Sequence, residues 1–144
     1  MKKSLYLTAV IMAFSFNAYA KDVSVSIIKD SLEDIGYKFD GGYSNAEYLN
    51  GKDNVSTVRI NANRDNIVNE VYLSISSTLI NYDKDEIRNR AETAFLPLVG
   101  DQHGVEEWIG NCIYEQNIGM NINVDGYNLT CTMGNETLNF SASK

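Results

Sequence analysis

Polar and apolar residues alternate one for one in several stretches of the chain, a pattern typical of strands with one face in a core and one in water. The first such stretch carries Val58, Ile60 and Ala62 on one face. Residues 71–76 repeat the pattern after an Asn- and Asp-rich segment at 63–66, which favours a tight turn. We therefore predict an antiparallel hairpin in the first half of the chain.

The last third of the chain shows the same alternation twice. Apolar side chains recur at every second position in 127–133 and again in 138–142. Asp125-Gly126 is a strong signal for a two-residue hairpin turn, and a short strand at 120–124 is expected on its other side. Two further short strands are expected at 37–39 and 46–49.

Three other stretches repeat apolar residues at every third or fourth position, which predicts amphipathic helices. Asp83 stands three residues before Glu86, the spacing of a helix-capping pair. Pro97 is expected to kink or end the helix that follows. Residues 102–104 are expected to form an exposed loop before the last helix. The predicted helices span 21–36, 83–99 and about 105–114.

Strands and helices at these positions predict a two-layer α+β fold. We expect an antiparallel sheet of about five or six strands with the three helices packed on one face. No repeat, low-complexity tract or linker divides residues 21–144. We therefore expect these residues to form a single domain.

Residues 1–20 are interpreted as an export signal and not as part of the fold. Lys2 and Lys3 supply positive charge, an apolar run follows, and Ala18-Tyr19-Ala20 provides the small residues that a signal peptidase requires. The run is short for a bilayer span, and no second candidate span follows it. We expect a bacterial signal cleaved after Ala20, a mature chain without a membrane span, and a periplasmic or secreted location.

Cys112 and Cys131 are the only cysteines. An exported chain meets an oxidising compartment, so we expect these two residues to form a disulfide. Cys131 shares a predicted strand face with Leu129, and Cys112 lies on the apolar face of the last predicted helix. The disulfide should therefore fasten that helix to the C-terminal part of the sheet.

The charge balance is acidic. Twelve Lys and Arg against 19 Asp and Glu give a net charge of −7, which becomes about −9 once Lys2 and Lys3 are removed. Nucleic acids and anionic membrane surfaces both require a basic binding surface, so neither is an expected partner. A basic protein remains compatible with this charge, although acidity also serves solubility alone.

Candidate catalytic groups are few. His103 is the only histidine, and Asp101, Glu106 and Glu107 lie close to it in the sequence. A histidine three residues before a carboxylate can share a helix face and move a proton or bind a metal. A helix cap at Asp101 with glutamates in the first helical turn explains the same residues without any chemistry. We expect no enzyme, no metal site and no cofactor, and keep a small hydrolase using His103 as the least favoured alternative.

Four tyrosines are candidate partner contacts: Tyr37, Tyr43, Tyr48 and Tyr72. Tyrosine offers a large, rigid contact area with a polar tip, and half-buried sheet residues are the alternative interpretation. We expect a non-enzymatic module that binds another protein, for instance an inhibitor or immunity factor against a basic enzyme acting on the cell envelope. A structural or assembly component of the envelope is the second hypothesis.

Overall fold

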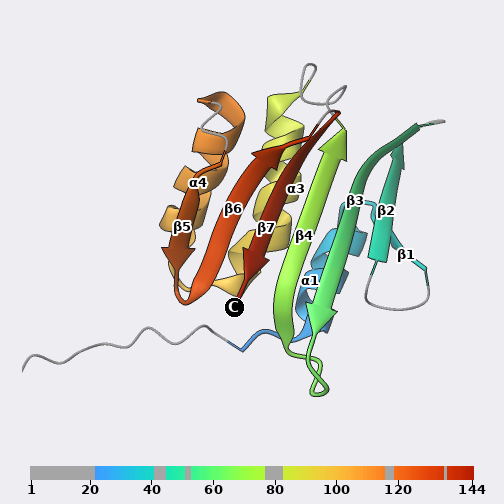
Figure 1. The fold of residues 1–144 in the computed structure, drawn as a ribbon. Helices are drawn as coiled ribbons and strands as arrows, with labels where there is room; N and C mark the ends of the chain where they lie inside the picture. Colours follow the sequence, from blue (N-terminus) through green and yellow to red (C-terminus); the bar gives the residue numbers. More distant parts are fainter. Residues whose placement is uncertain (1–21, 41–44, 51–52, 77–82, 116–118, 135) are drawn as a thin grey trace, which may run out of the picture.

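The computed structural model describes residues 22–40, 45–50, 53–76, 83–115, 119–134 and 136–144, with the backbone alone for 45–50 and 53–55. In this part of the chain, three helices lie behind one antiparallel sheet (Figure 1). The helices are α1 (Val25–Asp34), α3 (Lys84–Phe95) and α4 (Gln102–Tyr114), and the 3-10 turn η1 (Leu96–Leu98) follows α3. The strands are β1 (Lys38–Phe39), β2 (Asn45–Asn50), β3 (Asp53–Ala62), β4 (Val68–Ser76), β5 (Asn121–Val124), β6 (Tyr127–Met133) and β7 (Thr137–Ser143).

The sheet has the strand order β1-β2-β3-β4-β7-β6-β5. The C-terminal strand β7 pairs with β4 on one side and with β6 on the other, so it joins the two halves of the chain. The predicted α+β fold, with helices against an antiparallel sheet, is confirmed. The described residues form seven strands, and the shortest are the two-residue β1 and the four-residue β5 at the two edges.

The predicted alternation of apolar and polar residues gives the sheet one apolar, buried face and one polar face. From Val71 onward in β4 and throughout β7, every second side chain is buried beneath the helices, including Leu73, Leu138 and Phe140. The side chains between them lie on the opposite face, which no described helix covers (Figure 1). This open face carries mainly Ser, Thr and Asn, because a pleated face in water does not need apolar side chains.

An aromatic cluster occupies the core between the helices and the sheet. The Trp108 ring of α4 meets Phe95 of α3 and Phe140 of β7 edge to face, with centroid distances of 5.3 and 5.5 Å. All three side chains are fully buried. Edge-to-face contacts of this kind add to the free energy that burial of the rings already provides. The cluster thus packs two helices and the central strand together.

The helix ends follow the sequence signals in part. The Asp83 carboxylate accepts a hydrogen bond from the Glu86 amide at 3.0 Å, and Pro97 turns the end of α3 into the 3-10 turn η1. Two expectations need correction. Helix α1 begins at Val25, because Val23 bonds to Val68 beside the sheet, and 102–104 form the first turn of α4 and no loop.

One strand position also differs from the prediction. Ala62 was expected on the buried face with Val58 and Ile60, but it is exposed. The pairing of β3 with β4 is irregular between Asn61 and Ala62. An irregularity of this kind shifts the alternation by one residue, so the end of β3 leaves the core.

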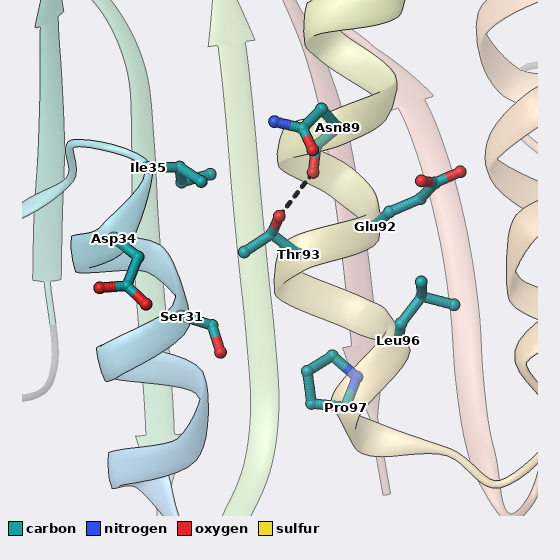
Figure 2. A pocket seen from close by; sticks show the side chains of 8 residues that line it. All are labelled: Ser31, Asp34, Ile35, Asn89, Glu92, Thr93, Leu96 and Pro97. Carbon is teal, nitrogen blue, oxygen red and sulfur yellow. Dashed lines mark hydrogen bonds between the residues drawn. The ribbon is translucent and has the colours of Figure 1, made fainter.

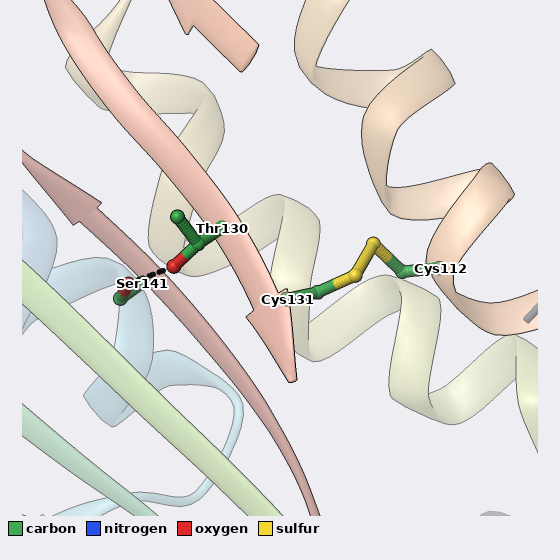
Figure 3. The surroundings of a disulfide bond; sticks show 4 residues. All are labelled: Cys112, Thr130, Cys131 and Ser141. Atoms are coloured by element: carbon green, nitrogen blue, oxygen red, sulfur yellow. Dashed lines mark hydrogen bonds between the residues drawn. A yellow bond between two sulfur atoms is a disulfide. The ribbon is translucent and has the colours of Figure 1, made fainter. Parts of the chain in front are cut away.

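The predicted disulfide between Cys112 and Cys131 is present and joins α4 to β6 (Figure 3). Cys131 points toward α4, whereas the neighbouring Thr130 points to the open face and lies 2.6 Å from the Ser141 hydroxyl. Both sulfur-bearing residues are buried. Helix α4 is therefore attached covalently to the strand that neighbours the edge strand β5.

Replacing both cysteines by Ala should lower the free energy of unfolding by about 3 kcal/mol, because a cross-link over a loop of this size restricts the unfolded chain. Urea unfolding of the variant and of the oxidised protein measures the difference. Unfolding of the original protein in reductant serves as the control and should give a similar loss. Equal midpoints for all three samples would contradict this account.

A buried tyrosine makes stability sensitive to high pH. Tyr127 is fully buried and its hydroxyl donates to the Val68 carbonyl at 3.2 Å. Burial raises the pKa of Tyr127 above 10.0, against an opposing effect of Lys144. The folded state therefore holds this proton more tightly than the unfolded state, and the associated stability is present below pH 10 and is lost as pH rises further.

The Tyr127→Phe variant should lose about 1 kcal/mol at neutral pH through the missing hydrogen bond. It should also lose less stability than the original protein between about pH 9.5 and 11, because it lacks the group that titrates. Urea midpoints across this range measure both effects. Parallel pH profiles for the two proteins would count against a raised pKa of Tyr127.

Candidate functional site

Charge is distributed unequally between the two layers. The three helices with their end residues Asp83, Asp101 and Glu115 carry eleven acidic and four basic side chains, and we call this surface the acidic helical layer. In contrast, the strands whose side chains the structure describes carry only Lys38, Arg59 and Glu70 as charged residues. The net negative charge is therefore concentrated on the helical side.

Most basic side chains of the acidic helical layer are already paired. Lys29 lies 3.5 Å from Glu33, Arg88 donates to Glu92 at 2.6 Å, and Arg90 pairs with Glu86. Several acids have no ion pair among the described residues, namely Asp30, Asp34, Glu106 and Glu107. These four acids lie on α1 and α4. Asp83 and Asp101 also lack an ion pair within the described ranges but cap helices, and Asp85 of α3 accepts a hydrogen bond from Tyr114.

Helix α4 borders a shallow depression of about 350 Å³ on its outer side. The Tyr114 hydroxyl donates to Asp85 at 2.8 Å, and this hydrogen bond raises the pKa of Tyr114 above 10.0. Tyr114 is also one of the more exposed large side chains, at 44%. The residues that line the depression are Arg88, His103, Glu106, Glu107, Gly110, Asn111, Tyr114 and Glu115.

The structure places the predicted catalytic candidates at this depression. His103 is exposed in the first turn of α4, and Glu106 and Glu107 border the same depression. Asp101 instead accepts a hydrogen bond from the Gly104 amide at 3.1 Å and caps the helix. Among the described residues, no hydrogen bond orients His103, and no three His, Cys, Asp or Glu side chains converge as a metal site requires.

A second, smaller groove lies between α4 and the edge strand β5. Its volume is about 250 Å³. Its apolar part consists of Trp108, Met120 and Ile122, and Glu107 adds an exposed carboxylate at the rim. The Trp108 indole Nε1 is buried and has no acceptor among the described residues. Gly104 and Asn111 complete the lining of what we call the edge groove.

Two attachments hold the walls of the edge groove together. At one end, the Asp125 carboxylate of the β5–β6 turn accepts hydrogen bonds from the backbone amides of Gly100 and Asp101, at 2.7 and 2.9 Å. At the other end, the disulfide joins α4 to β6. A Cβ on Gly104 would lie 2.9 Å from the Asp101 carboxylate, so this position favours Gly where the helix approaches the turn. The groove is therefore formed before any ligand binds.

A third depression lies between α1 and α3 and has a volume of about 400 Å³ (Figure 2). Ser31 extends from α1 toward the end of α3 at Pro97, and Asp34 lies over α1 beside it. The Thr93 hydroxyl donates to the Asn89 carbonyl of its own helix at 2.7 Å. The depression thus presents an acidic, polar rim that continues the surplus charge of α1.

The four candidate tyrosines are not brought together as one surface. Tyr72 is half-buried on the open face, where the Arg59 guanidinium lies 5.3 Å from its ring centroid. Tyr37 is only 2% exposed and its hydroxyl lies 2.6 Å from the Ser56 hydroxyl, so the interpretation of Tyr37 as a partner contact is wrong.

The side chains of the other two tyrosines are not among the described parts of the structure. Tyr43 lies outside the described residues. Tyr48 stands opposite Ser56 in β2, where the backbone alone is described. Tyr72 is therefore the one member of the predicted set with a described side chain on the open face.

Sequence reasoning missed the edge groove. Asp125 was interpreted only as a turn residue, and Met120 and Ile122 only as part of a short strand. The Asp-Gly signal gave the turn correctly, but the partners of the Asp125 carboxylate lie 24 and 25 residues away in the chain. Only the packing of α4 against this hairpin reveals the contact.

None of the helices in the described part of the chain has the length and apolar run needed to cross a bilayer.

Replacing Asp125 by Gly removes the acceptor of two backbone amides while tolerating the positive φ of 49° at this position. We expect the free energy of unfolding to fall by about 2 kcal/mol, since hydrogen bonds to charged groups are among the stronger ones. Urea unfolding measures the loss, and Asp125→Asn, which keeps an oxygen acceptor, should lose less than half as much. A Gly variant as stable as the Asn variant would show that the carboxylate does not hold the hairpin.

Comparison with models of protein families, with curated proteins and with solved structures finds no match for this chain.

Proposed function

We propose that this protein is an exported, non-catalytic binding module whose acidic helical layer contacts a basic protein. The proposal is carried by the unequal distribution of charge between the helices and the sheet. The partner class that fits is a basic enzyme acting on the cell envelope, which the module would inhibit or against which it would confer immunity. Because most acids lie on the helical layer, a basic partner would approach the protein from that side.

Electrostatics supports this choice of surface. A surface of one charge sign raises the association rate with an oppositely charged protein, and salt weakens the effect. The surplus acids on α1 and α4 form no ion pair among the described residues, so their charge is not neutralised by a direct contact. The open sheet face, with few charges, would steer a basic partner far less.

The disulfide supports export as part of the proposal. Disulfides persist in oxidising compartments and are rare where thiols are kept reduced. The cross-link also fixes α4, which carries Glu106 and Glu107, against the sheet. A binding surface that does not reorganise loses less entropy when the partner binds.

A structural or assembly role in the envelope is the second candidate. The observation that favours it is the broad open face, where rows of Ser, Thr and Asn side chains cross β4, β7 and β6. A flat polar face of this kind can lie against another component without a pocket. Self-association of the purified protein at micromolar concentration would favour this candidate over the first.

The test is an affinity experiment on periplasmic and culture-supernatant extracts at low salt, with the oxidised domain 21–144 as bait and mass spectrometry as readout. We expect one basic protein that raised salt releases. A variant with Asp30→Asn, Asp34→Asn and Glu106→Gln should retain at least tenfold less of it, because three unpaired acids of the helical layer are neutralised.

The matched control neutralises three exposed acids in connections outside the helices, through Asp40→Asn, Asp65→Asn and Glu136→Gln. Its net charge equals that of the test variant, so it separates the position of charge from its amount. We expect the control to retain the partner within about twofold. Equal losses in both variants, or no basic protein in the extract, would refute the proposal.

A further inference from the structure

Strand β5 is a free edge of the sheet. It pairs with β6 on one side, and no described strand lies on its other side. Its residues Asn121, Ile122, Asn123 and Val124 include neither a charge nor a proline. Sheet edges are usually protected by such residues, because unpaired backbone groups attract other strands.

The turn after β5 determines which backbone groups face outward. Asp125 and Gly126 both have positive φ, at 49° and 84°, as in a two-residue hairpin turn of the primed type. The residues that flank such a turn, Val124 and Tyr127, form a hydrogen-bonded pair, and these pairs alternate along an antiparallel ladder. The amides and carbonyls of Asn121 and Asn123 therefore point away from β6 to the free edge.

The edge groove lies beside these backbone groups. Ile122 is half-buried on the helix side of β5 and lines the groove with Met120 and Trp108. Its volume of about 250 Å³ is below the range of about 300–1,000 Å³ that small-molecule sites occupy. The groove therefore suits a single large side chain better than a whole small molecule.

One exposed polar group of the groove calls for a specific group in a ligand, and a buried polar atom lies in a lining residue. The buried Trp108 Nε1 has no acceptor among the described residues, and buried indole N–H groups normally have one. Glu107 at the rim is an exposed carboxylate without an ion pair in the described part of the chain. A basic side chain in the ligand would complement Glu107.

We propose that β5 and the edge groove bind an extended peptide segment of a partner protein, which pairs with β5 as an additional strand. One large apolar side chain of the segment occupies the groove against Met120 and Ile122, next to the buried Trp108. A Lys or Arg two residues along the segment lies on the same face and pairs with Glu107, because side chains of a strand alternate. Main-chain hydrogen bonds supply the affinity and the groove supplies the selectivity.

A second copy of this chain is a poorer occupant than a basic segment. The net charge is −7, so two copies repel each other, and β5 itself offers no basic residue to Glu107. The basic charge expected of the segment rests on the proposed function. The pairing of strands and the apolar contact stand on the geometry of β5 and α4.

The test uses a capped ten-residue synthetic peptide in which Leu stands two residues before Lys in an otherwise Thr- and Val-rich sequence. NMR follows its titration into the oxidised protein. We expect the Trp108 indole N–H resonance to shift, an unambiguous signal because Trp108 is the only tryptophan. The amides of Asn121 and Asn123 should become protected from hydrogen exchange at least tenfold.

The decisive variant is Asn123→Pro, which removes the outward amide without touching the pairing with β6. We expect its affinity for the peptide to fall at least tenfold. The matched control is Asn128→Thr, which loses the same side-chain hydrogen bond, 3.3 Å between Asn123 and Asn128, but keeps the edge amide. The control should bind within twofold of the original protein.

Peptide changes test the two side-chain contacts separately. Replacing the peptide Leu by Ser should weaken binding at least tenfold, and replacing its Lys by Glu should weaken it at least fivefold at low salt. Equal affinities for all three peptides would overturn the assigned contacts. No binding at 1 mM peptide, or unchanged affinity of Asn123→Pro, would overturn the proposal as a whole.

Two further outcomes distinguish strand addition at β5 from self-association and from the proposed function. If the protein alone sediments as a dimer that Asn123→Pro abolishes, the edge belongs to a second copy and the peptide proposal is wrong. If the extract yields no basic partner but the peptide binds with the expected protection, the proposed function fails and strand addition at β5 stands. If the protein captures a basic partner but does not bind the peptide, the proposed function stands and strand addition at β5 fails.

Discussion

The burial of one face of the sheet is the constraint on which the rest of the structure depends. The apolar side of the central strands needs a cover, and the three helices supply it from one side only. Helices α3 and α4 come between β4 and β5 in the chain, and the last strand, β7, then returns to pair with β4. The aromatic cluster of Phe95, Trp108 and Phe140 lies where these parts meet.

The same constraint gives the two layers different kinds of polar side chain on their outer faces. Helices that cover a core direct their outer faces to water, and long charged side chains suit that position because they lose little conformational freedom there. A strand face in water favours β-branched and small hydroxyl side chains, which fit the pleated surface. The separation of charged side chains on the helices from a nearly uncharged open face thus follows from the architecture, whereas the negative sign of the helical charge is set by the sequence. Binding to one layer need not disturb the other.

Sequence reasoning recovered the architecture because its signals are local. The alternation around Val58 and Leu73 and the helical stripes needed no knowledge of the fold, and the single possible cysteine pair left one connectivity. The errors came from non-local contacts. Tyr37 is buried by its contact with Ser56 in β3, and α1 begins late because Val23 pairs beside β4. The edge groove depends on the packing of α4 against β5, which no local pattern encodes.

The two ends of the described chain lie side by side. The Lys144 ammonium is 3.2 Å from the Asp22 carboxylate, and the Lys144 backbone amide bonds to Asn69 at the start of β4. The first and last described residues are thus adjacent in space, and an ion pair joins them. A short linker could therefore join these two ends, and new termini could be placed at another exposed turn. Such a circular permutation keeps the packing, because the packing depends on which elements are neighbours and not on which one comes first.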